Sequence, residues 1–267
     1  MKHLPIGIFD SGLGGLTVFK AIQKELPHER IVYFGDTARI PYGTKSPDTI
    51  IRYARQIIRF FRKKEKVKCV VVACNTSSAW ALEAVRKEFS LPILGVIEPG
   101  AFTAVEVTRN GRIGVIGTEG TVASGAYEKA IRRLMPKARV FSRACPLFVP
   151  LVEEGKLTGP IPEAVAKEYL KPLLKAGIDT LVLGCTHYPL LKRTLSKVAG
   201  KRVRIVDSAE ETARSLRRNL ETHGVELSGR GGSRFFVSDL SRKFKEQAQR
   251  FLGRHIATVE KVFIENY

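Results

Sequence analysis

The chain has 267 residues, 44% hydrophobic and 27% charged, which is ordinary for a folded globular protein and excludes intrinsic disorder. At about 150 residues per domain, this length predicts one large domain or two small ones. The formal net charge of +19 attracts anions of any kind, so nucleic-acid binding is one hypothesis. No stretch is apolar for long enough to be a membrane span or a secretory signal, and four cysteines are too few for a disulfide scaffold. We therefore expect a cytoplasmic protein with reduced thiols and no membrane partner.

Short apolar runs alternate with amphipathic segments along the chain. Four of these runs predict buried strands: 6–9, 31–34, 69–73 and 93–97. Between them, segments that begin near Gly15, Pro47 and Ser77 have helical periodicity, and the alternation restarts at 112–116. Strands that alternate with helices indicate a mainly parallel sheet with helices on both faces, so we predict an α/β fold.

The densest basic group lies on one predicted helix. Its members recur every three or four residues: Arg52, Arg55, Arg59, Arg62 and Lys66. Apolar side chains between them form a stripe, which indicates an amphipathic helix with a solvated basic face. No zinc-finger spacing or aromatic RNA-binding run accompanies this face, so no specific nucleic-acid partner is predicted.

The two halves of the chain repeat each other at an offset of about 109 residues. Five landmarks match in the same order: 6–8 with 113–115, 21–22 with 130–131, 30–31 with 139–140, 70–74 with 181–185, and Glu98 with Asp207. This order predicts two pseudo-symmetric lobes, each a mainly parallel sheet flanked by helices. If Glu98 and Asp207 open equivalent helices, the end of the chain returns to the first lobe.

Two cysteines occupy equivalent positions in the repeat. Cys74 and Cys185 each follow an apolar strand and precede small polar residues and a helix. Ligands of open α/β sheets bind at the carboxyl ends of strands, and a helix N-terminus favours the thiolate form of cysteine. A lone free cysteine is most often a small buried hydrophobic residue, but two at matched positions favour a chemical role. Cys69 and Cys145 have no cysteine at their equivalent positions.

Three further segments are candidates for a site. The run from Asp10 to Gly15 follows the first strand and lets a ligand approach the backbone, although a tight turn capped by Asp10 is the alternative. It is no dinucleotide fingerprint, because Thr17 stands where that motif needs glycine. Residues 35–43 have the turn chemistry of loops that line sites. His187 can act as the acid–base partner of Cys185, whereas the spacing of cysteine and histidine does not predict a zinc site.

If the two lobes face each other, Cys74 and Cys185 flank one substrate in the cleft between them. Two thiols on opposite faces of a carbon suit stereochemical inversion, since one removes the α-proton and the other delivers a proton. The weak acidity of that proton requires desolvated bases and hydrogen bonds to the developing charge.

Several segments resemble the signatures of bacterial glutamate racemase: Ile8-Phe9-Asp10-Ser11-Gly12-Leu13-Gly14-Gly15-Leu16, Gly35-Asp36, Pro41-Tyr42-Gly43, Ala73-Cys74-Asn75-Thr76 and Gly184-Cys185-Thr186-His187-Tyr188-Pro189-Leu190. The resemblance covers essentially the whole chain and departs from the family only in the high net charge. It implies interconversion of L- and D-glutamate without metal or cofactor, which supplies D-glutamate for peptidoglycan, and it allows a homodimer. It also implies one lobe of residues 1–97 and 208–267 and a second lobe of residues 98–207.

The same resemblance implies roles for individual residues. Cys74 and Cys185 would be the bases, the first assisted by Asp10 and the second by His187 and Glu153. Eight residues would contact glutamate: Asp10, Ser11, Tyr42, Gly43, Asn75, Thr76, Thr186 and His187. Thr118 and Thr121 are weaker candidates for such contacts. The nearest alternative is aspartate racemase, and a basic nucleic-acid-binding protein is the alternative from another class.

Overall fold

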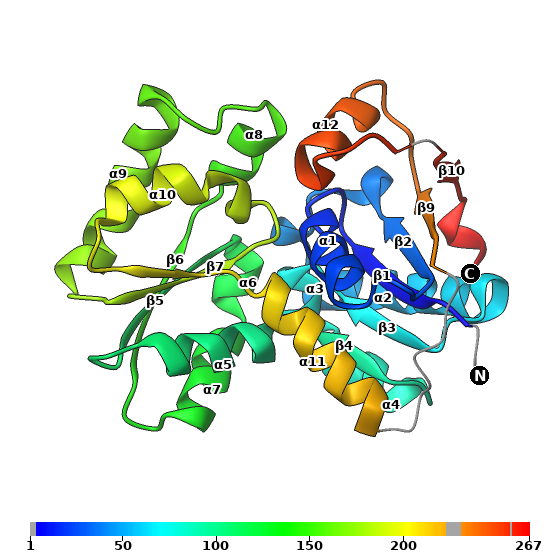
Figure 1. Cartoon of the computed structure of the whole chain (residues 1–267), viewed down its shortest axis with the longest axis horizontal. Coiled ribbons are helices and arrows are strands. Elements are labelled where there is room, and N and C mark those ends of the chain that lie inside the picture. Colours follow the sequence, from blue (N-terminus) through cyan, green and yellow to red (C-terminus); the bar gives the residue numbers. More distant parts are fainter. Residues whose placement is uncertain (1–3, 223–230, 257) are drawn as a thin grey trace. The chain divides into compact units, whose positions relative to one another are not determined.

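The computed structural model describes residues 4–222, 231–256 and 258–267, and the chain divides into two compact units (Figure 1). Unit 1 comprises Met1–Val96 and Ala209–Tyr267, and unit 2 comprises Ile97–Ser208. Each unit contains one parallel sheet flanked by helices, which confirms the predicted α/β fold. No helix in the described ranges is both long and apolar enough to cross a membrane.

Unit 1 has a six-stranded sheet in the order β10-β9-β2-β1-β3-β4. Its strands are β1 (Ile6–Asp10), β2 (Ile31–Gly35), β3 (Cys69–Val72), β4 (Ile93–Gly95), β9 (Ser233–Val237) and β10 (Glu260–Lys261). β1, β2 and β3 are buried throughout, which explains their continuous apolar sequences. The run predicted as a strand at 93–97 is shorter in the structure, because Ile97 already opens a helix.

Helices cover both faces of this sheet. They are α1 (Leu16–Glu25), α2 (Pro47–Phe60), α3 (Asn75–Trp80), α4 (Leu82–Glu88), α11 (Ala209–Thr222) and α12 (Phe244–Leu252). Side chains of successive strand residues point to opposite faces, and each face has its own aromatic cluster. Phe60 of α2 packs on Phe34 and Phe236 with ring centroids 5.5 and 5.2 Å apart. Phe19 of α1 packs on Tyr33 and Phe235 of the other face.

The basic helix has the predicted apolar stripe but a shorter basic row. α2 is followed by a π-helix, Phe61–Glu65, and Lys66 ends it with a φ of 52°, outside the helical row. Arg55 and Arg59 both pair with Glu88, at 2.6 and 3.0 Å. Part of the charge on this face is therefore neutralised within unit 1.

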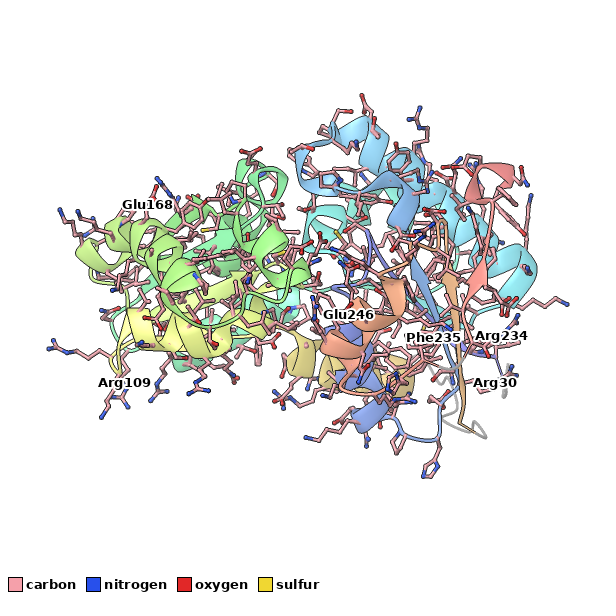
Figure 2. All side chains as sticks on the ribbon, turned by 90° about the horizontal axis from the view of Figure 1, so that it is seen from above. Arg30, Arg109, Glu168, Arg234, Phe235 and Glu246 are labelled. Atoms are coloured by element: carbon pink, nitrogen blue, oxygen red, sulfur yellow. The ribbon has the colours of Figure 1, made fainter. Side chains whose placement is uncertain are left out.

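Unit 2 has a four-stranded sheet in the order β6-β5-β7-β8. Its strands are β5 (Arg112–Gly117), β6 (Arg139–Ala144), β7 (Thr180–Gly184) and β8 (Arg204–Val206). Its helices are α5 (Ile97–Val107), α6 (Glu119–Ala123), α7 (Ala126–Leu134), α8 (Phe148–Glu153), α9 (Pro160–Lys175) and α10 (Lys192–Ala199). Exposed charged side chains occur on both units, as Figure 2 shows for Arg109 and Glu168 of unit 2 and Arg234 and Glu246 of unit 1.

The two sheets correspond strand for strand. The strand order β2-β1-β3-β4 in unit 1 matches β6-β5-β7-β8 in unit 2, and equivalent residues have equivalent partners within each sheet. Ile6 pairs with Ile31 and Cys69, and Ile113 pairs with Val140 and Thr180. These pairs agree with the offset found in the sequence, so the predicted correspondence of the two halves is confirmed. β9 and β10 extend the sheet of unit 1 alone.

The helix after the fourth strand of each half belongs to the other unit. α5 follows β4 of unit 1 but packs on α7 in unit 2, and α11 follows β8 of unit 2 but packs on α1 in unit 1. Because α1 and α7 are equivalent in the repeat, this exchange of helices is reciprocal. It returns the end of the chain to unit 1, where β9 lies beside β2 (Figure 1). That the units act as separate domains stays a prediction.

Candidate active site

Cys74 lies at the carboxyl end of β3, directly before α3. Its sulfur accepts a hydrogen bond from the Ser77 N–H at 3.5 Å and donates to Oγ of Ser11 at 3.7 Å. Ser11 follows Asp10, the last residue of the neighbouring strand β1. The buried carboxylate of Asp10 accepts a hydrogen bond from the Gly12 N–H at 2.9 Å. The structure therefore brings Asp10, Ser11 and Cys74 to the same edge of one sheet.

Close packing surrounds Asp10. A Cβ added at Gly15 would lie 2.5 Å from Cβ of Asp10, so a larger residue cannot fit without displacing the carboxylate. The buried Tyr33 hydroxyl donates to the Gly12 carbonyl at 2.9 Å. Burial raises the pKa of Tyr33 well above its usual value, and the negative charges of Asp10 and an ionised Cys74 raise it further. Tyr33 is thus a neutral support for this loop.

The predicted contact residues of unit 1 gather around this thiol. Asn75 and Thr76 form the buried first turn of α3. The short 3₁₀ helix Tyr42–Thr44 packs against α3, which places Tyr42 and Gly43 beside it. We call these seven residues the Cys74 group: Asp10, Ser11, Tyr42, Gly43, Cys74, Asn75 and Thr76.

The Tyr42 hydroxyl is directed to a residue outside the predicted site. It donates to the carboxylate of Asp36, which is fully buried and follows β2. The same carboxylate accepts hydrogen bonds from Nε of Arg39 at 2.7 Å and Oγ of Ser238 at 2.8 Å. Burial raises the pKa of Tyr42, and the charge of Asp36 raises it further, so the phenol keeps its proton. Because its O–H donates to Asp36, the Tyr42 oxygen can only accept a hydrogen bond from a ligand.

Cys185 follows β7 in unit 2, at the position equivalent to Cys74. Its sulfur lies 4.0 Å from Nδ1 of His187, and Nε2 of the same ring lies 3.3 Å from Oε1 of Glu153 at the end of α8. The thiol and the imidazole are buried, whereas the Glu153 side chain is 34% exposed. The structure therefore arranges a thiol, an imidazole and a carboxylate in a row.

Three threonines complete the group in unit 2. Gly117 lies opposite Gly184 in the β5–β7 ladder, so Thr118 and Cys185 leave adjacent strand ends. The hydroxyls of Thr118 and Thr121 lie 3.0 Å apart. Thr186, which stands between Cys185 and His187 in the sequence, is buried. We call six residues the Cys185 group: Thr118, Thr121, Glu153, Cys185, Thr186 and His187.

The two thiols have different partners despite their equivalent backbone positions. By the strand register, Gly117 is the equivalent of Asp10, so unit 2 has no carboxylate at that position. Conversely, Thr76 stands in unit 1 where His187 stands in unit 2. Cys74 directly caps α3, whereas Cys185 is followed by the 3₁₀ helix Tyr188–Leu191.

The other two cysteines are held neutral. Burial raises the pKa of Cys69 to about 12, and burial likewise raises the pKa of Cys145 to about 12. Both thiols therefore stay protonated near neutral pH, and neither is suited to remove a proton from a ligand.

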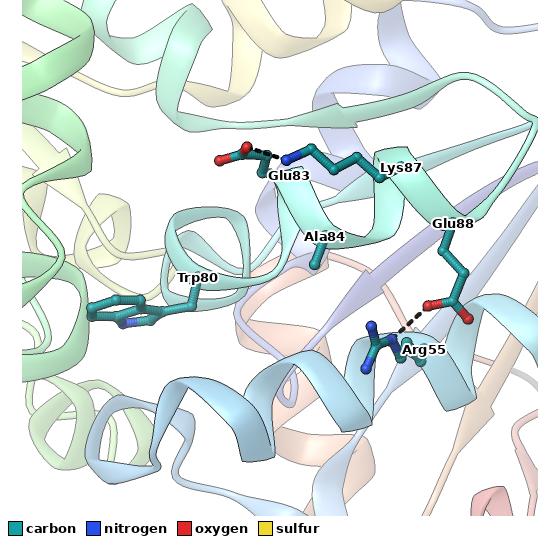
Figure 3. A pocket seen from close by; sticks show the side chains of 6 residues that line it. All are labelled: Arg55, Trp80, Glu83, Ala84, Lys87 and Glu88. Carbon is teal, nitrogen blue, oxygen red and sulfur yellow. Dashed lines mark hydrogen bonds and ion pairs between the residues drawn. The ribbon is translucent and has the colours of Figure 1, made fainter.

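A shallow groove on unit 1 lies apart from the Cys74 group. Six residues of α2, α3 and α4 line it: Arg55, Trp80, Glu83, Ala84, Lys87 and Glu88 (Figure 3). Its charges pair with one another, Lys87 with Glu83 at 2.7 Å and Arg55 with Glu88 at 2.6 Å. None of the predicted site residues lines this groove, so it offers no alternative location for their chemistry.

Comparisons with known proteins show the family and the fold of the chain. Residues 7–216 match the family model described as "Asp/Glu/Hydantoin racemase". The glutamate racemase of Geobacter metallireducens is 54% identical over 269 residues, which covers 99% of this chain and 98% of that protein. The structure of glutamate racemase from Francisella tularensis in complex with D-glutamate superimposes with a TM-score of 0.93, at 38% identity and full coverage of both chains. Glutamate racemase isoform RacE1 from Bacillus anthracis gives a TM-score of 0.92 at 42% identity, with 98% of each chain covered.

Proposed function

Because the chain belongs to the Asp/Glu/Hydantoin racemase family, we propose that it is an amino-acid racemase that interconverts L- and D-glutamate through two thiols. Relatives of about half identity over the whole chain and closely superimposable glutamate racemases support the activity. The observation that carries the mechanism is the pair Cys74 and Cys185, which occupy equivalent strand ends in two equivalent sheets. Inversion requires an acid–base group on each face of the α-carbon, and two thiols at equivalent strand ends of a repeated sheet support this requirement.

In the proposed reaction, one thiolate removes the α-proton of glutamate while the opposite thiol delivers a proton to the other face. The two thiols exchange these roles when the reaction runs in reverse. From the resemblance, Cys74 acts on D-glutamate and Cys185 acts on L-glutamate. Asp10 supports the first thiol by its charge at the end of β1.

His187 is the proposed proton partner of Cys185. Glu153 accepts a hydrogen bond from Nε2–H, which leaves Nδ1 as the nitrogen that faces the thiol. In this tautomer Nδ1 can accept the thiol proton, and the carboxylate stabilises the imidazolium that results. The row of three side chains thus supplies a Cys185 thiolate beside a His187 imidazolium that holds the proton.

The remaining members of the two groups are proposed to bind glutamate. Ser11, Thr76, Thr118, Thr121 and Thr186 supply hydroxyls, Asn75 supplies an amide, and Gly43 supplies a backbone N–H. Glutamate carries two carboxylates, and such donors stabilise both these charges and the charge that develops at Cα. The proposal also includes the peptidoglycan role that the resemblance implies, the cytoplasmic location expected from the composition, and the homodimer that the resemblance allows.

Proton exchange tests this proposal directly. Purified protein, dialysed against a chelator and freed of pyridoxal phosphate, is incubated in heavy water with each enantiomer of glutamate. We expect α-deuterium and the opposite enantiomer to appear together by NMR and chiral chromatography. Activity that returned only with pyridoxal phosphate or a metal would exclude the two-thiol mechanism.

The choice of glutamate is tested against aspartate under the same conditions. We expect kcat/KM for glutamate to exceed that for aspartate by at least about a hundredfold, because a shorter side chain cannot reach the donors that hold the distal carboxylate. Faster turnover of aspartate would assign the chain to the alternative substrate.

A further inference from the structure

A clamp of hydrogen bonds joins the loop after β2 to the turn after β9, 202 residues later. Ser238 Oγ donates to Oδ1 of Asp36 at 2.8 Å and accepts from the Ala38 N–H at 2.9 Å. Next to it, Thr37 Oγ1 accepts from the Asp239 N–H at 2.9 Å and donates to the Asp239 carbonyl. Four hydrogen bonds therefore join three residues after β2, Asp36 to Ala38, to two residues after β9, Ser238 and Asp239.

Asp36 connects this clamp to the Cys74 group. The carboxylate that Ser238 holds also accepts a hydrogen bond from the hydroxyl of Tyr42, whose 3₁₀ helix packs on α3. The backbone N–H of Asp36 donates to the carbonyl of Asp10 at 3.0 Å. One buried residue thus touches both the Asp10 strand end and the Tyr42 turn.

Unit 2 has no equivalent of the clamp. β9 adds a strand beside β2 in unit 1, while β6, the equivalent of β2, is the edge of its sheet among the described residues. Cys145 stands at the position equivalent to Asp36, by the register of β6 with β5. A change in the clamp should therefore affect one thiol and not the other.

We infer that Asp36 and Ser238 are positioning residues that hold the Tyr42 turn against the Cys74 end of the substrate site. This inference rests on the proposed function and extends it, because it assigns part of the site to the C-terminal segment that lies outside the repeat. A buried carboxylate with three donors has little freedom to move, and small displacements of groups that position a substrate are costly for turnover.

Ser238→Ala is the mildest test of the clamp. It removes only the hydroxyl. The backbone hydrogen bond from the Ser238 N–H to the Gly35 carbonyl does not involve the side chain and is retained. We expect kcat/KM to fall about tenfold in both directions equally, since the equilibrium constant between enantiomers cannot change. Ser233→Ala, which removes a hydroxyl from the first residue of β9, is the matched control and should stay within about twofold.

The selectivity of the effect separates positioning from general destabilisation. Cys185→Ser leaves only Cys74 to exchange the α-proton of one enantiomer, and Cys74→Ser leaves only Cys185 to exchange that of the other. At saturating glutamate in heavy water, adding Ser238→Ala should slow the Cys74-dependent exchange about tenfold and the Cys185-dependent exchange less than about threefold. A loss of folded protein would lower both exchanges equally, and that result would overturn the inference.

A double-mutant cycle tests whether Ser238 acts through Asp36. Asp36→Asn should itself lower kcat/KM at least tenfold, and adding Ser238→Ala should change that value by less than about twofold. Thr37→Val, on the other half of the clamp, should reproduce the selective loss. Additive effects of Asp36→Asn and Ser238→Ala, or wild-type kinetics in Ser238→Ala, would refute the clamp. If the wild-type protein failed to exchange the α-proton of glutamate at all, the proposed function would fail instead, and the two results are distinguishable.

Discussion

The imidazole of His187 has a different neighbour at each nitrogen, the thiol of Cys185 at 4.0 Å and the carboxylate of Glu153 at 3.3 Å. This arrangement in unit 2 contrasts with Cys74 in unit 1, whose sulfur contacts a serine hydroxyl and a backbone N–H. The two thiols should therefore respond differently when their partners are changed.

His187→Asn keeps a polar side chain but removes the imidazole beside Cys185, which is the proposed proton carrier. We expect kcat to fall about 10²-fold or more, and by unequal factors in the two directions, because only one thiol loses its partner. The kcat/KM values must fall equally in both directions. Chiral assays started from each pure enantiomer measure both quantities, and Glu153→Gln should show a smaller loss. A kinetically silent His187→Asn would remove His187 from the mechanism.

Cys69 and Cys145 should be chemically silent. Burial raises the pKa of each to about 12, so both stay protonated from pH 6 to pH 10. We expect Cys69→Ala and Cys145→Ala to leave the pH profile of kcat/KM unchanged in that range and its value within about threefold. A pH profile that shifted in either variant would show that the wrong thiols were assigned as bases.

At the scale of elements, the strands near the middle of each sheet could be predicted almost to the residue. Continuous apolar runs such as 31–34 and 69–73 are too short for a helix and are typical of strands covered on both faces of a parallel sheet. β9 was not predicted, because its five residues gain their stability from β2, which lies about 200 residues away in the chain. Periodicity within a short window contains no information on such a pairing.

The candidate site was predictable in its thiols and less so in its supports. Cys74 and Cys185 are marked by the repeat itself. The sequence predicts Asp36 only as part of a loop, since a single carboxylate forms no pattern and its partner Ser238 is remote in sequence. One signal could have found it: Asp36 follows β2 just as Asp10 ends β1, and parallel neighbours place both at the same edge.

The turn before β5 depends on Asp179. Its carboxylate accepts hydrogen bonds from the Thr108 hydroxyl at 2.7 Å, the backbone N–H groups of Arg109 and Asn110 at 2.7 and 2.8 Å, and the Thr180 hydroxyl at 2.9 Å. Burial alone would raise the pKa of Asp179, but these hydrogen bonds outweigh it and lower the pKa. The carboxylate therefore stabilises the fold above its unfolded pKa of about 3.9, and this contribution is lost as the pH falls through the lower folded value.

Asp179→Asn should accordingly lower stability by about 1 kcal/mol at pH 7, after allowance for solvent around a partly exposed group. For a chain of this length, Tm should fall by about 2 °C. Calorimetry at pH 7 and at pH 3 measures the difference, which should shrink at the lower pH. An equal loss of Tm at both pH values would contradict a role for the charge.

At the scale of the whole molecule, the net charge of +19 remains the feature that the fold does not explain. The exposed charges are spread over both units, and Arg55 and Arg59 of the basic helix pair with Glu88. We therefore expect only weak, length-dependent binding to nucleic acid, with affinity that falls steeply as salt rises. Titration of labelled DNA from 20 to 200 mM salt measures this. Sequence-selective binding at 150 mM salt would favour the nucleic-acid alternative.

In the proposed mechanism two thiols serve opposite faces of one carbon, and deuterium exchange in the two serine variants tests this most directly. Serine keeps the shape of cysteine but is a far weaker acid, so Cys74→Ser and Cys185→Ser should each lose racemisation by about a thousandfold or more. Each variant retains one thiol, so in heavy water Cys74→Ser should place deuterium slowly into L-glutamate alone, and Cys185→Ser into D-glutamate alone. Near-normal racemisation by either variant, or exchange of both enantiomers by a single remaining thiol, would contradict the account.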